Sequence, residues 1–98
     1  MQIEKLIVEI VKEQSLIIGE PLAKSRAEDA GVVKFNSANI EDLSVTQQDN
    51  SKVISRLFKS YEELFGQASI EVCLDVLKRH PSNEITPMLP EELRSAFA

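Results

Sequence analysis

Apolar residues recur at every third or fourth position along residues 51–65, and polar residues fill the positions between them. This spacing predicts a helix with one buried face and one solvated face. The apolar stripe consists of Val53, Ile54, Leu57, Phe58, Tyr61, Leu64 and Phe65. Asp49, Asn50 and Ser51 precede the stripe, and any of them can accept hydrogen bonds from the free N–H groups of the first turn.

A second amphipathic pattern covers residues 67–80, directly after Gly66. Its apolar face consists of Ala68, Ile70, Cys73, Leu74 and Leu77, widened by Val72 and Val76. Gly66 has no Cβ, so it can take the positive φ that ends a helix. Pro81 disfavours a helical conformation at the preceding residue and marks the stop. Because the connection is so short, residues 51–65 and 67–80 are predicted to form a central helical hairpin.

The N-terminal part of the chain predicts two further helices, over residues 2–18 and 21–30, with a break at Gly19. The first helix carries a broad apolar arc of Ile3, Leu6, Ile7, Val8, Ile10, Val11, Leu16 and Ile17. The second helix is predicted to turn Leu22, Ala23, Ala27 and Ala30 inward, and its small alanines allow close approach of another helix. Lys24 and Glu28 lie four residues apart on its outer side, a spacing that favours an ion pair.

Residues 32–46 fit two alternatives equally, a short β-hairpin and an irregular loop. The first candidate strand contains Val32, Val33 and Phe35. The second candidate strand contains Ile40, Leu43 and Val45. Residues 36–39 have the composition of a turn, whereas residues 40–43 also fit one helical turn.

Prolines divide the last part of the chain, residues 81–98. We expect residues 82–90 to be extended, and residues 90–97 to form a short terminal helix that begins at a proline. Leu93 and Phe97 lie four residues apart in that helix, where they can dock on the core or on a neighbour. A frayed terminus is the alternative.

A chain of 98 residues, of which 43% are apolar, predicts one small folded domain. The predicted fold is mainly α, a small helical bundle of about four helices around the central hairpin, with the β-hairpin at 32–46 as an option. Residues 1–80 are assigned to a single helical domain, and residues 81–98 to a proline-containing tail with a short terminal helix.

The formal net charge is −5, from 11 basic and 16 acidic residues. An acidic chain repels phosphate backbones and anionic membranes, so neither nucleic acid nor a membrane is an expected partner. Lys52, Arg56 and Lys59 form a basic stripe on the helix at 51–65. Such a stripe is typical of a solvated face, and docking of an acidic partner is the alternative.

The residues that carry catalytic or metal chemistry are few. Cys73 and His80 occur once each, about two helical turns or 10 Å apart, too far for direct proton transfer. The three glycines are isolated, so no phosphate-binding loop can be written. Glu71 and Asp75 share a helix face, which is typical of a solvated acidic edge. We therefore expect no enzyme, no metal and no cofactor.

The opening segment is interrupted by charges, and no apolar run reaches the ~20 residues that cross a bilayer, so we expect a cytoplasmic protein. The broad arc of residues 2–18 predicts burial on more than one side, by the fold itself or by a second copy.

Together these features predict a small non-catalytic protein–protein interaction or regulatory module, self-associating as a homodimer. The candidate interface residues are Ile3, Ile7, Ile10, Val11, Leu93 and Phe97. The alternative is a helical carrier or sensor that binds an apolar small ligand in the bundle core.

Overall fold

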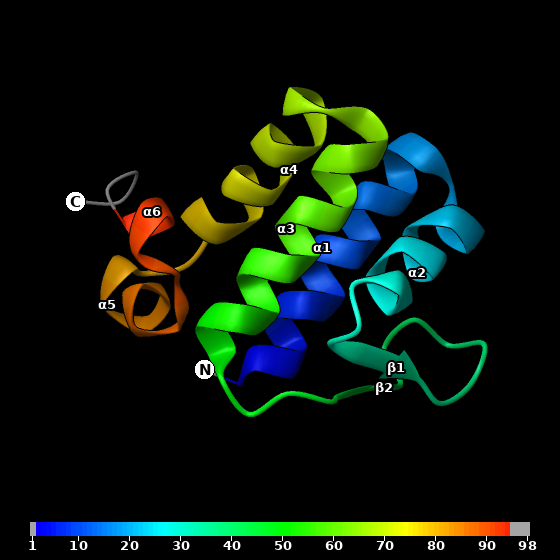
Figure 1. Ribbon diagram of the computed structural model, residues 1–98, viewed down its shortest axis with the longest axis horizontal. Helices are drawn as coiled ribbons and strands as arrows, with labels where there is room; N and C mark the ends of the chain where they lie inside the picture. The colour runs from blue at the N-terminus through cyan, green and yellow to red at the C-terminus, as the bar shows by residue number, and fades with distance from the viewer. Residues whose placement is uncertain (1, 95–98) are drawn as a thin grey trace.

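The computed structural model describes residues 2–94, apart from the side chain of Glu92. Within these residues the longer helices are α1 (Ile3–Ile18), α2 (Glu20–Asp29), α3 (Asn50–Phe65) and α4 (Gln67–Lys78). A two-stranded sheet of β1 (Val33–Phe35) and β2 (Leu43–Val45) separates α2 from α3. The chain continues through α5 (Ser82–Ile85), the 3₁₀ helix η1 (Thr86–Met88) and α6 (Glu91–Arg94). This confirms a mainly helical bundle with a short β-hairpin (Figure 1).

The longer helices pack as a ring. Helix α1 contacts α2 and α4, and α3 contacts the same two helices. Figure 1 shows α2 and α4 on opposite sides of the pair formed by α1 and α3. The apolar stripe of each helix therefore faces one shared core.

The apolar stripe of α1 is the most completely buried part of this core. Leu6, Ile7, Ile10 and Val11 have no exposed surface. Burial of each such side chain stabilises the fold by roughly 1.5–3 kcal/mol relative to an exposed position. Helices α2 and α4 and strand β2 of the same chain supply the cover. This part of the α1 arc therefore needs no second copy to leave water, whereas Leu16 and Ile17 at its end stay exposed.

The helical hairpin begins and turns as its sequence predicts, and α4 ends at Lys78, two residues before the predicted end at residue 80. The Asp49 carboxylate accepts hydrogen bonds from the backbone N–H groups of Ser51 (3.0 Å) and Lys52 (3.4 Å) and so caps α3. Gly66 has a positive φ of 65°, and its N–H donates to the Glu62 carbonyl at 2.7 Å. This single residue connects α3 to α4, which makes the two helices neighbours.

The structure decides between the two alternatives for residues 32–46 in favour of the β-hairpin. Its strands are antiparallel, with Val33 opposite Val45 and Phe35 opposite Leu43. Asn36, the first residue after β1, ties the loop to β2, since its side-chain amide donates to Ser44 Oγ at 2.9 Å.

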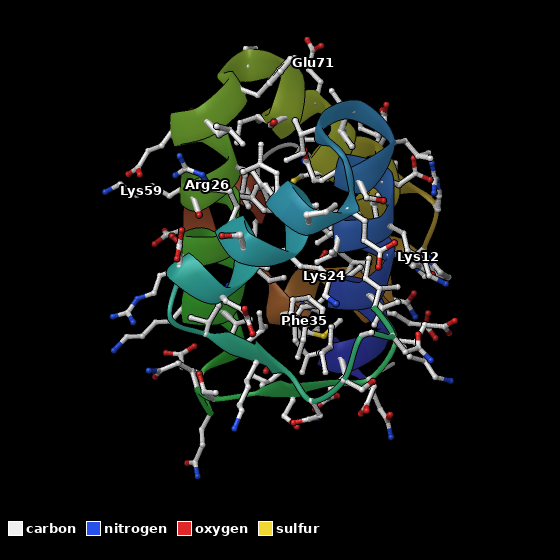
Figure 2. All side chains as sticks on the ribbon, turned by 90° about the vertical axis from the view of Figure 1, so that its right-hand side faces the viewer. Lys12, Lys24, Arg26, Phe35, Lys59 and Glu71 are labelled. Atoms are coloured by element: carbon white, nitrogen blue, oxygen red, sulfur yellow. The ribbon has the colours of Figure 1, made fainter. Side chains whose placement is uncertain are left out.

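Two side chains of α2 fasten the hairpin to the helices. The Lys24 ammonium lies 5.1 Å from the centre of the Phe35 ring and donates to the Ala38 carbonyl at 3.0 Å, as Figure 2 shows for Lys24 and Phe35. The Glu28 carboxylate accepts from the Phe35 N–H at 3.2 Å. The predicted Lys24–Glu28 ion pair is therefore wrong, because both residues bind the hairpin instead.

The stretch predicted to be extended is helical. Prolines can begin helical turns, and here they precede or start α5 and η1 instead of preventing them. Helix α6 lies within the terminal helix predicted at residues 90–97. The turns place Ile85, Met88 and Leu89 in the core, and the Ser51 hydroxyl donates to the Leu89 carbonyl at 3.4 Å. Part of the predicted tail thus packs into the same core as α1–α4.

Tyr61 allows a direct test of how α2 and α3 are joined. Its side chain is fully buried, and its hydroxyl donates to the Ala23 carbonyl of α2 at 2.7 Å. We expect Tyr61→Phe to lower the free energy of unfolding by about 1–2 kcal/mol, because it leaves a buried carbonyl with one partner fewer. Urea unfolding measures this loss. The control Glu62→Gln changes an exposed neighbour and should cost under about 0.5 kcal/mol; equal stability of both variants would contradict the packing described.

Candidate functional site

The predicted interface residues of α1 lie in the core of the single chain. Ile7, Ile10 and Val11 are fully buried, and Ile3 is 9% exposed. They form no surface in this fold, because other helices of the same chain cover them. The periodic pattern correctly identified the buried face of α1. It could not show whether a partner or the rest of the same chain covers that face.

The two C-terminal residues of that interface prediction lie elsewhere. Leu93 is half-buried and borders a surface hollow on the α3–α4 side of the bundle, together with Phe58 and Ile70. Phe97 lies outside the described residues. The structure therefore does not join Leu93 to the α1 residues in one surface, and self-association stays a prediction.

A different set of large apolar side chains is exposed. Leu16 is 80% exposed, Phe65 49%, and Ile17 and Leu22 42% each. Leu16 and Ile17 belong to the last turn of α1, Leu22 to the first turn of α2, and Phe65 is the last residue of α3. All of them thus stand where a helix begins or ends.

These helix ends meet at one end of the bundle. Gly19 connects α1 to α2 and Gly66 connects α3 to α4, and both turns lie in the upper part of Figure 1. The Gln14 side-chain amide donates to the Ser69 carbonyl at 3.0 Å, which ties the end of α1 to the start of α4. We call this surface, with Leu16, Ile17, Leu22 and Phe65, the apolar end.

Exposed carboxylates lie at the apolar end. Glu20 begins α2, Glu62 and Glu63 lie in the last turns of α3, and all three are exposed. Glu71 of α4 projects from the same end in Figure 2. An apolar surface with a charged rim of this kind resembles the make-up of protein–protein interfaces.

The predicted basic stripe lies on another face. Arg56 and Lys59 of α3 line a hollow of about 320 Å³ together with Arg26 of α2. Asp29 and Glu63 line the same hollow, so its charge is mixed. This arrangement fits a solvated groove between two helices.

Sequence reasoning missed a polar group inside the core. Gln14 is fully buried, and its amide donates to the Ser69 carbonyl and to the Cys73 sulfur at 3.3 Å. Gln14 Oε1 and Ser69 Oγ have no hydrogen-bond partner among the described residues. The signal was available, because position 14 continues the three- and four-residue spacing of Ile10 and Val11. A polar residue at such a position is buried together with the apolar residues of the same helix face.

Cys73 and His80 have separate partners. Cys73 is buried against Gln14, and burial raises the pKa of its thiol to about 12, an effect that the hydrogen bond from Gln14 partly opposes. His80 Nε2 lies 2.6 Å from Glu9 Oε2, and Arg79 pairs with Glu13 at 2.7 Å. These two contacts fasten the end of α4 to α1.

Among the described residues, no group of three His, Cys, Asp or Glu side chains is placed to hold a metal ion. None of the helices within residues 2–94 is both long enough and apolar enough to cross a bilayer. The chain matches no protein-family model, no curated protein and no solved structure. The function is therefore inferred from the surface of the molecule.

The pKa of Cys73 gives a pH-dependent prediction. The unfolded thiol ionises near its ordinary pKa of 9.0, whereas the folded thiol keeps its proton up to about 12. Between these values only the unfolded state releases the proton, so the stability that this residue contributes falls as the pH rises through 9. From about pH 8 to about pH 10, we expect the wild type to lose about 1 kcal/mol more than Cys73→Ala. Urea unfolding at both pH values measures the difference, and equal losses would show that the thiol ionises in the folded protein.

Proposed function

We propose that this protein is a small non-catalytic protein–protein interaction module that associates through its apolar end. The observation that carries the proposal is the exposure of Leu16, Ile17, Leu22 and Phe65 at one end of an otherwise well-packed bundle. Single exposed apolar residues are ordinary, but several at one end point to a surface that a partner covers.

Self-association is the simplest form of this function. Two copies paired end to end would remove four large apolar side chains per copy from water. In such a symmetric pair each patch faces its own equivalent, so no further surface is needed. The carboxylates of Glu20 and Glu71 would then face like charges, which weakens the pair at low ionic strength.

The small size of the domain supports the same proposal. A chain of this length buries a smaller fraction of its surface than a larger domain does, so additional apolar burial contributes much to its stability. Residues on the apolar end supply that burial without any change in the core. Ile7→Asp, by contrast, would disrupt the core and could not report on association.

Leu16→Glu tests the proposal, because the Leu16 side chain is 80% exposed and its replacement should not disturb the core. We expect the wild type to approach twice the 11.0 kDa chain mass as concentration and salt rise, in light scattering over a dilution series. Leu16→Glu should weaken the dimer at least about tenfold, since it places a charge in an apolar contact.

The matched control is Gln48→Glu, which adds the same charge at an exposed position in the link between β2 and α3. It should dimerise like the wild type. A wild type that stays at the monomer mass throughout, or equal weakening by both variants, would overturn self-association through the apolar end.

A further inference from the structure

One residue, Gly66, separates two helices that would otherwise form a single helix. Its N–H donates to the Glu62 carbonyl at 2.7 Å, and its carbonyl accepts from the Ser69 N–H at 3.2 Å. Both backbone groups thus already take part in helical turns, and the break lies in the dihedral angles of Gly66, φ 65° and ψ −145°. Rotation of these two angles to helical values would join α3 and α4 into one helix over residues 50–78.

A continuous helix would pair backbone groups that the hairpin leaves free. Helix α4 begins at Gln67 without a hydrogen bond from a capping side chain, so the N–H groups of its first turn have no such partner. In a continuous helix these N–H groups donate to the last carbonyls of α3. The added hydrogen bonds offset part of the free energy that opening the hairpin costs.

An opened chain cannot remain alone, because the segment after Gly66 is part of the core. We call residues 67–94 the C-terminal arm; it contains α4, α5, η1 and α6 and lies on one side of the bundle (Figure 1). The apolar side chains of the arm without any exposed surface include Val76, Leu77, Ile85 and Leu89. Release of the arm would expose them and uncover the faces of α1 and α3 that they cover. An opened chain therefore needs a replacement for its own arm.

We infer that two copies of this chain exchange their C-terminal arms, with Gly66 as the hinge. The arm of a second copy fits the uncovered surface because it has the same sequence as the arm that left. The polar contacts of the monomer form again between copies, such as Gln14 with Ser69 and Glu13 with Arg79. Each copy then completes the core of its partner. This inference goes beyond the proposed function and does not rest on it, because the exchange makes no use of the apolar end.

The hinge sets the balance between the monomer and the exchanged dimer. The covalent link holds each arm close to its own chain, so the monomer predominates at low concentration. Glycine tolerates the hairpin conformation, whereas residues with a Cβ rarely combine φ 65° with ψ −145°. A Cβ at Gly66 would meet no atom within 4 Å, so Gly66→Ala adds backbone strain without a clash. A helical hinge releases this strain, and alanine is the best helix former.

Gly66→Ala tests the inference by light scattering. We expect the dissociation constant of its dimer to be at least about a hundredfold lower than that of the wild type, about tenfold for each of the two hinges. Gly31→Ala is the matched control, because Gly31 also has a positive φ, 77°, and open space around its Cβ but lies between α2 and β1. This control should lower the stability without raising the mass.

Cross-linking shows which copy supplies the arm. Glu13→Cys and Arg79→Cys are combined in a Cys73→Ala background, so the only thiols replace the ion pair that joins α1 to the arm at 2.7 Å. A short bis-maleimide then links them. In a denaturing gel the exchanged dimer runs at twice the chain mass, whereas a monomer, or a dimer formed through another surface, runs as a single chain. We expect Gly66→Ala to give the band of doubled mass.

Two further samples make the result decisive. A flexible glycine–serine insertion after position 66 of Gly66→Ala lets the hairpin close without strain, so it should restore the single-chain band. The wild-type hinge, refolded from urea at rising protein concentration, should give a growing band of doubled mass even if Gly66→Ala folds poorly. A single-chain band in both Gly66→Ala and the refolded wild type would overturn the inference.

Leu16→Glu separates this inference from the proposed function. Added to Gly66→Ala, it should leave the band of doubled mass unchanged, because arm exchange does not involve Leu16. Dimers that Leu16→Glu dissociates, and that give only the single-chain band, would support the apolar end and refute arm exchange. Bands of doubled mass from a wild type that Leu16→Glu does not weaken would refute the apolar end alone.

Discussion

The fold depends on the enclosure of the α1 apolar stripe by other parts of the same chain. Leu6, Ile7, Ile10 and Val11 lose all contact with water between α2, α4 and the β-hairpin. Polar contacts join neighbouring elements, such as Tyr61 of α3 to Ala23 of α2, or His80, just after α4, to Glu9 of α1. Apolar burial provides the driving force, and these contacts fix how the helices are arranged.

The same enclosure explains why one end of the bundle is apolar. The ring of helices covers the middle of each stripe, but Gly19 and Gly66 turn the chain at its upper end (Figure 1). Ile17 and Phe65 continue the spacing of the buried residues beyond the point where a neighbouring helix can cover them. Leu16 faces away from the stripe altogether and is the most exposed large apolar residue among those described. Function is therefore proposed at the helix ends.

Much of the fold follows from local patterns in the sequence. The hairpin of α3 and α4 follows from the spacing of Val53 to Leu77 and from the turn at Gly66. The sequence could not decide between a β-hairpin and a loop at residues 32–46. The reason is that the hairpin depends on pairing between residues distant in sequence, such as Val33 and Val45. The helical turns within residues 82–88 were missed for the same reason, since Ile85 and Leu89 are stabilised by a core that local sequence does not describe.

The candidate site was predicted less well than the fold. Periodicity shows that a helix face is apolar, but not whether the chain or a partner covers it. Ile7 and Ile10 were therefore assigned to an interface although they fill the core. Leu22 and Phe65, by contrast, were predicted to face inward although they are 42% and 49% exposed. Only the arrangement of the four helices shows that Leu16 and Phe65 share one end.

The most direct test of the account is hydrogen exchange at high and low protein concentration. If one chain closes its own core, the backbone amides of residues 6–11 in α1 will keep the same strong protection at every dilution. Any concentration dependence will be confined to the helix ends around Gly19 and Gly66. Loss of protection at residues 6–11 on dilution would contradict the account, because it would show that a second copy covers the α1 stripe.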